Sequence, residues 1–248
     1  FSTIDNRLGV KFGSGNGAVA LGGNSAFGLN SDYDVDDGGA NPFLALASGS
    51  GYLSSQFAAG ERLKISVGYS KNRLENERRG MSPQQLAALS QLKPYQATAN
   101  IVTVSYQASP RVTATVNYTM LRERSSLLGV QSADANDLGD GSITDAGTYG
   151  VDVEMTPNLS IGASVTVGRT RAGDKTKQNI VVSKGGAIST SFQLVAEKTH
   201  LFDKKDSARI TFSQPLHIES GSIDFDSVQV VNRQTGELGV VTQKVGLQ

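Results

Sequence analysis

The chain has 248 residues, a formal net charge of zero, no Cys and no Trp. The balanced charge gives no electrostatic footprint for nucleic acid, and the lack of Cys excludes disulfides, Cys-ligated metals and thiol catalysis. The 28 Gly and 6 Pro suit a β protein with many turns, and no run of about 18 apolar residues predicts a transmembrane helix.

Residues 1–40 are expected to form an N-terminal segment or linker with short strands at 7–12 and 18–21. Gly15-x-Gly17-x-x-Ala20 is loosely similar to a dinucleotide fingerprint. No helical pattern follows it, and a phosphate site of that type needs a helix N-terminus. We therefore expect a Gly-rich turn.

The acidic stretch 32–39 approximates a calcium loop. Its Gly stands one place late for an EF-hand, and Phe43 occupies the position of the bidentate Glu. A solvated acidic loop is the simpler interpretation, and calcium binding stays open. No cofactor and no metal site is predicted.

From residue 41 the pattern predicts strands. Residues 43–47 and 52–57 are expected to be strand segments, and in 62–70 four apolar side chains alternate with polar and basic ones. After a charged loop, Ser82-Pro83 begins a short helical pattern with Leu86, Leu89 and Leu92, which predicts a loop helix.

The clearest signal is a β-hairpin around Thr156-Pro157-Asn158. On each side, apolar and polar residues alternate for about ten residues, over 148–155 and 159–168. The same pattern predicts strands at 100–107 and 111–121, and at 188–197 and 208–214. Strands of about 9–11 residues are long enough to cross a tilted bilayer, whereas soluble strands cluster near about 5–6.

The connections between these strands alternate in length, so that one end of the sheet carries tight turns and the other long loops. They are long after Ser70, short at Pro110, long after Leu121, short at Pro157, long after Arg169 and short at Lys204. This asymmetry is typical of outer-membrane barrels. We therefore predict an all-β fold, an antiparallel up-and-down transmembrane β-barrel of the outer-membrane type over 41–248. The rival is a soluble β-sandwich or solenoid, which the low aromatic content favours.

In the barrel interpretation the polar faces of the strands line a lumen, where paired charges could brace a plug or tune a pore. Ordinary solvated strand charge is the alternative. The residues predicted to face the lumen are Arg62, Lys64, Thr113, Thr115, Asn117, Asp152, Glu154, Ser164 and Thr166.

Four stretches resemble the C-terminal β-barrel, or translocator domain, of subtilisin-like serine protease autotransporters. The most specific runs from Ile210 through Gln214-Pro215-Leu216-His217 to Gly221, and is similar to a Gln-Pro-Leu-Arg-Val-Glu-Ser-Gly stretch of that family. The others are 118–123 with 127–129, 161–171, and 41–47. His217 departs from the Arg of the family pattern.

The resemblance implies a bacterial outer-membrane barrel of about a dozen strands, joined to a secreted passenger in the same chain. Such barrels continue beyond the position of Gln248, so we expect residues 41–248 to lack the last strands. The expected partners are outer-membrane lipid, the passenger, and proteins that contact the long loops, with no nucleic acid.

No catalytic residues are predicted. A subtilisin unit needs Asp, His and Ser together, and the two histidines, His200 and His217, have no matching motif. We expect both to be polar strand-end residues and any protease domain to lie upstream. A free-standing outer-membrane channel or structural barrel, and a soluble all-β binding or adhesion domain, remain the alternative functions.

Overall fold

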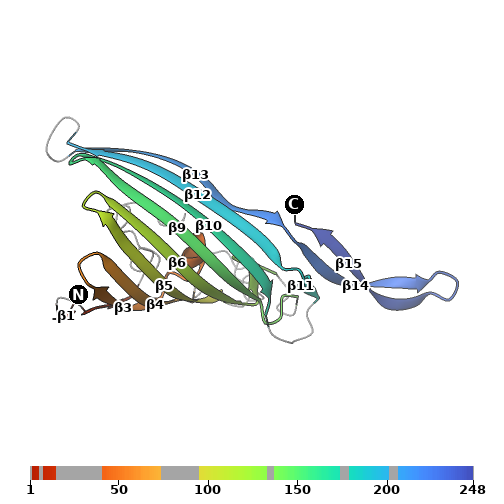
Figure 1. Ribbon diagram of the computed structural model, residues 1–248. Coiled ribbons are helices and arrows are strands. Elements are labelled where there is room, and N and C mark those ends of the chain that lie inside the picture. The colour runs from red at the N-terminus through yellow and green to blue at the C-terminus, as the bar shows by residue number, and fades with distance from the viewer. Residues whose placement is uncertain are drawn as a thin grey trace, which may run out of the picture.

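The computed structural model describes residues 2–5, 8–14, 41–73, 95–132, 137–173, 179–200 and 206–247. These residues form an all-β structure in which one large antiparallel sheet dominates (Figure 1). The sheet contains, in spatial order, β1 (Ser2–Asp5), β2 (Leu8–Gly13), β3 (Gly51–Ala59), β4 (Leu63–Arg73), β5 (Gln96–Ser109), β6 (Val112–Arg124), β9 (Ser142–Thr156), β10 (Leu159–Ala172), β12 (Ala187–Thr199) and β13 (Ser207–Ser220).

The strands follow one another up and down, as the sequence predicts. Tight turns join β3 to β4, β5 to β6 and β9 to β10, and the last of these is the predicted hairpin. Long connections at the opposite end span residues 14–50, 74–95, 125–141 and 173–186. We call the two ends the turn end and the loop end. The predicted asymmetry is confirmed for these connections, and the short turn predicted at Lys204 lies outside the described residues.

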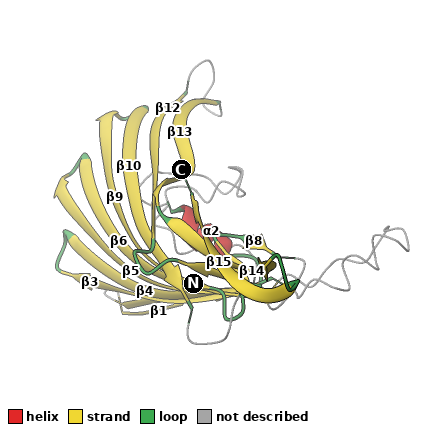
Figure 2. Cartoon of the chain, turned by 90° about the vertical axis from the view of Figure 1, so that its right-hand side faces the viewer, coloured by secondary structure: helices red, strands yellow, loops and turns green. Residues whose placement is uncertain are grey.

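The sheet is strongly curved but open. Figure 2 shows its arc in profile, with the short helix α2 (Pro42–Leu46) inside the curve. In the described part of the chain β1 and β13 are the two edges and do not pair, so the predicted closed barrel is not seen. Closure needs the two edges to share a hydrogen-bond ladder.

Successive side chains along each strand point to opposite faces, and the register keeps the two sets apart across the sheet. The concave face is crossed by a row of polar residues that lie opposite one another on six strands. They are the half-buried Ser66 and the buried Thr103, Asn117, Thr148, Thr166 and Ser191. The convex face carries large apolar side chains that are exposed, among them Phe57, Val67, Tyr69, Val104, Tyr106, Val116, Tyr149, Val165, Phe192 and Leu194.

The strand predicted at 43–47 is wrong, because these residues begin a helix. The Asn41 side chain accepts a hydrogen bond from the Leu44 backbone N–H at 3.1 Å, and Pro42 takes the first helical position. Phe43 and Leu44 are both fully buried, which a strand with alternating faces would not allow.

The wall strands also extend further toward the loop end than predicted. β4 reaches Arg73, β6 reaches Arg124, and β9 begins at Ser142 within the predicted polar connection. The alternation in hydropathy is lost there on β4, β6 and β10, because their outward positions become Lys or Arg.

Two small sheets lie at the loop end. β14 (Ser222–Asn232) and β15 (Glu237–Gly246) form a hairpin that projects beyond the large sheet, and β11 (Ile180–Val182) pairs with β14 (Figure 1). β7 (Ser126–Leu127) and β8 (Val130–Gln131) pair with each other. None of the described residues forms a helix long and apolar enough to cross a bilayer.

Several predictions from the sequence fall outside the described residues. They are the strand at 18–21, the Gly-rich turn beyond Ser14, the acidic stretch 32–39 and the loop helix near 82–92. The strand predicted at 7–12 corresponds to β2, which belongs to the large sheet.

The packing of α2 against the large sheet can be tested at Gly168 in β10. A Cβ atom at this position would overlap the ring of Phe43, which is fully buried and has no room to retreat. We expect Gly168→Ala to lower the free energy of unfolding by about 1–3 kcal/mol, measured by urea denaturation followed by circular dichroism. Gly185→Ala, where a Cβ meets open space, is the control. Equal stability of the two variants would contradict the packing of α2 against β10.

Candidate functional site: the concave face and its helix

The helix α2 is tied to the wall of the sheet by polar side chains at both of its ends. At the start, Asn41 Nδ2 donates to Thr119 Oγ1 of β6 at 2.7 Å, a bond that is buried. At the end, Ser70 Oγ of β4 donates to the Ala47 carbonyl at 2.8 Å, and Asn72 Nδ2 donates to the Leu46 carbonyl at 3.3 Å. The helix is therefore held in one position against β4 and β6.

Apolar contacts extend this seat across the curve of the sheet. Phe43 and Leu44 pack among small or apolar inward residues of β5, β6 and β9: Ala97, Ala99, Ile101, Leu121 and Ala146. Phe43 also meets Gly168 of β10, and Leu216 of β13 packs against the same cluster. The helix thus links strands that are far apart in the sheet, and it fills the concave side at the loop end.

A buried carboxylate on β6 joins several segments of the chain beside the helix. Glu123 of β6 has no exposed surface and accepts four hydrogen bonds: from the Tyr95 hydroxyl at 3.0 Å, the Leu128 and Gly129 backbone N–H groups at 2.8 and 2.7 Å, and the Ser142 hydroxyl at 2.9 Å. These donors come from three different segments. Glu123 therefore fixes the loop after β6 and the start of β9 to one point.

The same contact changes the acidity of Tyr95, which lies just before β5. Burial, and then the Glu123 carboxylate beside it, raise the pKa of the Tyr95 hydroxyl well above its usual range. The neutral hydroxyl is the form that donates to Glu123, so the fold favours protonated Tyr95.

Toward the turn end none of the described residues forms a helix over the concave face, which is lined there by hydroxyl, amide and charged groups. Thr148 and Thr166 share a hydrogen bond at 2.9 Å, and Ser105 and Thr115 share one at 3.3 Å. Among the described residues, the Oδ1 atom of Asn117 is buried without a partner. The concave surface is therefore divided into an apolar seat for α2 and an open polar half.

The predicted lumen residues lie on or at the margin of this polar half. Thr115, Asn117, Ser164 and Thr166 are buried on the concave face, with Thr115 and Ser164 each opposite Gly150 of β9. Thr113 and Asp152 are half-buried and face each other across β6 and β9. Lys64 and Glu154 are exposed near the turn end, and Arg62 lies in the turn before β4.

The charged members of this set do not form ion pairs with one another. The ion pair found at the turn end joins Arg209 of β13 to Glu197 of β12 at 3.5 Å, and neither residue was predicted. The structure therefore does not show the suggested pairing of opposite charges for Arg62, Lys64, Asp152 and Glu154.

The helix α2 and Glu123 were missed as site components. A signal for the helix was present, since Asn followed by Pro matches an N-cap and the first helical position. Glu123 had no comparable signal, because its partners Tyr95, Leu128 and Ser142 meet only in the fold.

The two histidines lie apart from this site. His200 follows β12 with a positive φ of 56°, and its Nδ1 is 3.2 Å from Asn158 Oδ1. His217 of β13 has Nδ1 3.4 Å from Glu219 Oε1.

No protein-family model, curated protein or solved structure matches this chain. The resemblance to autotransporter barrels therefore stays a prediction, and the function has to be argued from the structure itself.

The carboxylate cluster gives a test of how the loop end is held. Glu123→Gln replaces one accepting oxygen by an amide group that faces donors, so we expect a loss of about 2–3 kcal/mol in the free energy of unfolding. The exposed Glu237→Gln of β15 is the control and should change stability by less than about 0.5 kcal/mol. A Glu123 variant as stable as this control would show that the four bonds are unimportant.

Tyr95 predicts a specific dependence of stability on pH. Its pKa is higher in the fold than the unfolded value of about 10. Above that pH the unfolded chain releases a proton that the fold retains, so stability should fall with rising pH by about 1.4 kcal/mol per unit from this group. Comparing urea denaturation at pH 9 to 11.5 in the wild type and Tyr95→Phe, we expect the shallower slope in the variant. The exposed Tyr106→Phe should keep the wild-type slope, and equal slopes in all three would contradict the assignment.

Proposed function

We propose that the chain forms the wall of a bacterial outer-membrane β-barrel that anchors or translocates an N-terminal passenger. The observation that carries this proposal is the polarity of the large sheet. Outside the contact with α2 its concave, shielded face is polar, and its convex, exposed face carries large apolar side chains, which is the reverse of a soluble sheet with a packed core.

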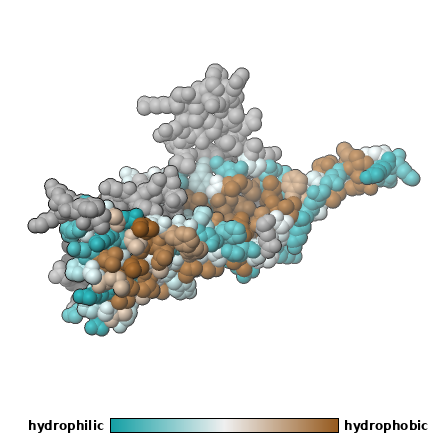
Figure 3. All heavy atoms as spheres, turned by 90° about the horizontal axis from the view of Figure 1, so that it is seen from above, coloured by the Kyte–Doolittle hydropathy of each residue, from teal (hydrophilic) through white to brown (hydrophobic). Residues whose placement is uncertain are grey.

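In water this arrangement would be costly. Burying one Val, Leu or Phe side chain stabilises a fold by about 1.5–3 kcal/mol. The convex face leaves many such side chains exposed on neighbouring strands. Figure 3 shows apolar residues gathered along the sheet, bordered by hydrophilic residues at its left end. A contiguous apolar surface of this extent marks a contact with lipid or protein.

Lipid is favoured over a protein partner by the length and arrangement of the strands. From β3 to β13 every strand of the large sheet has 9 to 15 residues, which suits a tilted crossing of the hydrocarbon layer. The tight turns at one end and long loops at the other suit a periplasmic and an extracellular side. In this proposal the two edges of the sheet are paired in the membrane, because unpaired edge groups in hydrocarbon cost several kcal/mol each.

Support for the autotransporter type comes from where the four resembling stretches lie. Asn41 of one stretch bonds Thr119 of the second, Phe43 packs on Gly168 of the third, and Leu216 of the fourth joins the same apolar cluster. Stretches far apart in the sequence thus meet around α2. Reading the coding sequence upstream of Phe1 tests the passenger: a secreted domain supports it, and a signal peptide alone favours a free-standing channel or structural barrel.

The membrane proposal is tested by matched Val→Lys substitutions. Val165 is 44% exposed on the convex face of β10, and Val230 is 53% exposed on β14, outside the large sheet. In lipid, Val165→Lys should cost about 2–4 kcal/mol and reduce the heat-modifiable folded form on electrophoresis of outer membranes, whereas Val230→Lys should not.

A soluble β domain predicts a different result. There an exposed Val→Lys change has little effect at either position, and unboiled samples in detergent show no band of altered mobility. That pair of results would reject the membrane proposal.

A further inference from the structure

The convex face changes from apolar to cationic at the loop end. On β4, β6 and β10 the last two outward positions are occupied by exposed Lys or Arg residues. We call this set the cationic belt; its members are Lys71, Arg73, Arg122, Arg124, Arg169 and Arg171.

The belt runs across neighbouring strands in register. Lys71 lies opposite Thr98, Thr98 opposite Arg122, and the row continues through Ile143 to Arg171. Between the long cations of β4 and β6, the shorter side chains of β5 leave a cavity of about 350 Å³. Lys71, Arg122 and Arg124 line it together with the polar Gln96 and Thr98, and the acidic residues Glu123 and Asp140 also border it.

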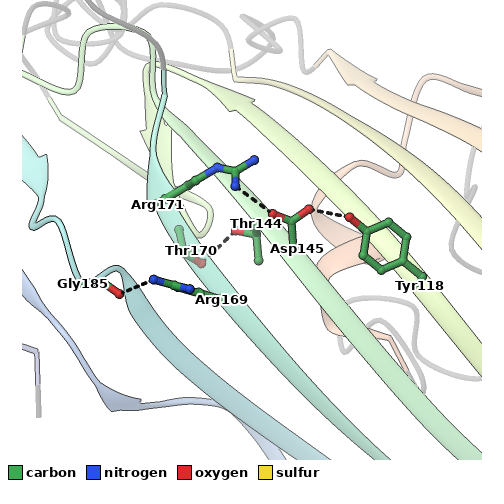
Figure 4. A network of polar contacts seen from close by, with 7 residues as sticks. All are labelled: Tyr118, Thr144, Asp145, Arg169, Thr170, Arg171 and Gly185. Atoms are coloured by element: carbon green, nitrogen blue, oxygen red, sulfur yellow. Dashed lines mark hydrogen bonds and ion pairs between the residues drawn. The ribbon is translucent and has the colours of Figure 1, made fainter.

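Among the described residues, five of the six cations of the belt have no carboxylate in an ion pair with them. Asp145 accepts from the Tyr118 hydroxyl at 2.6 Å and pairs with Arg171 at 3.3 Å, while Arg169 donates to the Gly185 carbonyl at 3.1 Å (Figure 4). Lys71, Arg73, Arg122 and Arg124 form no ion pair with any carboxylate of the described residues.

The other end of the same strands is different. The first outward residues of β4, β6 and β10 at the turn end are Leu63, Val112 and Leu159, which are apolar. The positive charge of these three strands on the convex face is therefore concentrated at the loop end, directly above the apolar surface.

We propose that the cationic belt binds the phosphate groups of lipid headgroups in the outward leaflet of the membrane, those of a phosphorylated glycolipid such as lipid A. This inference rests on the proposed function, since it needs the convex apolar face to lie in lipid. Guanidinium groups match phosphate oxygens in bidentate geometry. In a lipid the acyl chains would lie against the apolar face and the phosphate against the belt next to it. A soluble phosphate has no acyl chain to contact the apolar face.

The test uses the full-length gene product, purified in a neutral detergent and titrated with lipid A, with bound lipid counted by native mass spectrometry. The belt variant carries Lys71→Gln, Arg73→Gln, Arg122→Gln and Arg124→Gln. The control removes four exposed cations elsewhere, by Arg111→Gln, Lys198→Gln, Arg233→Gln and Lys244→Gln. We expect the belt variant to bind lipid A at least about tenfold more weakly and the control to bind as the wild type does.

Two further arms identify the source of the phosphate. Dephosphorylated lipid A should bind the wild type as weakly as intact lipid A binds the belt variant, and millimolar inorganic phosphate should not displace intact lipid A. The inference is overturned if the belt variant retains wild-type affinity, if the control loses as much, or if inorganic phosphate competes fully. Heat-modifiable mobility of each purified protein separates the two proposals. If the wild type shows no heat-modifiable mobility, the barrel proposal is rejected. If it shows this mobility but binds intact and dephosphorylated lipid A equally, only the proposal for the cationic belt is rejected.

Discussion

The rest of the structure depends on the two-residue period of its strands, kept in register from β3 to β12. Because neighbouring strands place polar residues opposite polar ones, a slip of one residue in any pair would send apolar side chains to the concave side. The row from Ser66 to Ser191 has no such break across six strands. The hydrogen bond between Thr148 and Thr166 is a direct result of that register.

Small side chains on the concave face make room for the helix. Ala97, Ala99 and Ala146 project little from their strands, and Gly168 provides the surface for the Phe43 ring. Asn41 Oδ1 accepts from the Leu44 backbone N–H and Ser70 Oγ donates to the Ala47 carbonyl, so these buried backbone groups at the helix ends have partners. In a closed barrel, α2 would obstruct the interior near the loop end and leave the polar half open toward the turn end. This arrangement suits an anchor whose interior is occupied better than a wide open pore.

The sequence predicted the parts of this fold that depend on local periodicity. The up-and-down strands, the β9–β10 hairpin and the two unequal ends follow from alternation and turn residues alone. It missed α2, because two adjacent buried residues, Phe43 and Leu44, look like a short apolar strand when the Asn41 cap is disregarded. It could not find the Glu123 cluster, whose donors come from three segments that only the fold brings together. Closure of the sheet depends on pairing between its two edges, for which no local pattern exists.

The strand extensions that the sequence missed also give the height of the apolar surface. Ten residues separate Val112 from Arg122 on β6, and ten separate Leu159 from Arg169 on β10. At about 3.3 Å per residue this is about 33 Å along the strand, and a tilt of about 35–45° reduces it to roughly 25 Å along the normal. That is the height of the lipid-facing band of outer-membrane barrels. On β4 the first cation, Lys71, stands eight residues from Leu63. The ladder places Lys71 and Arg122 at one level and Arg169 two residues nearer the turn end. The cationic belt is therefore placed where headgroups would begin if the convex face lies in lipid.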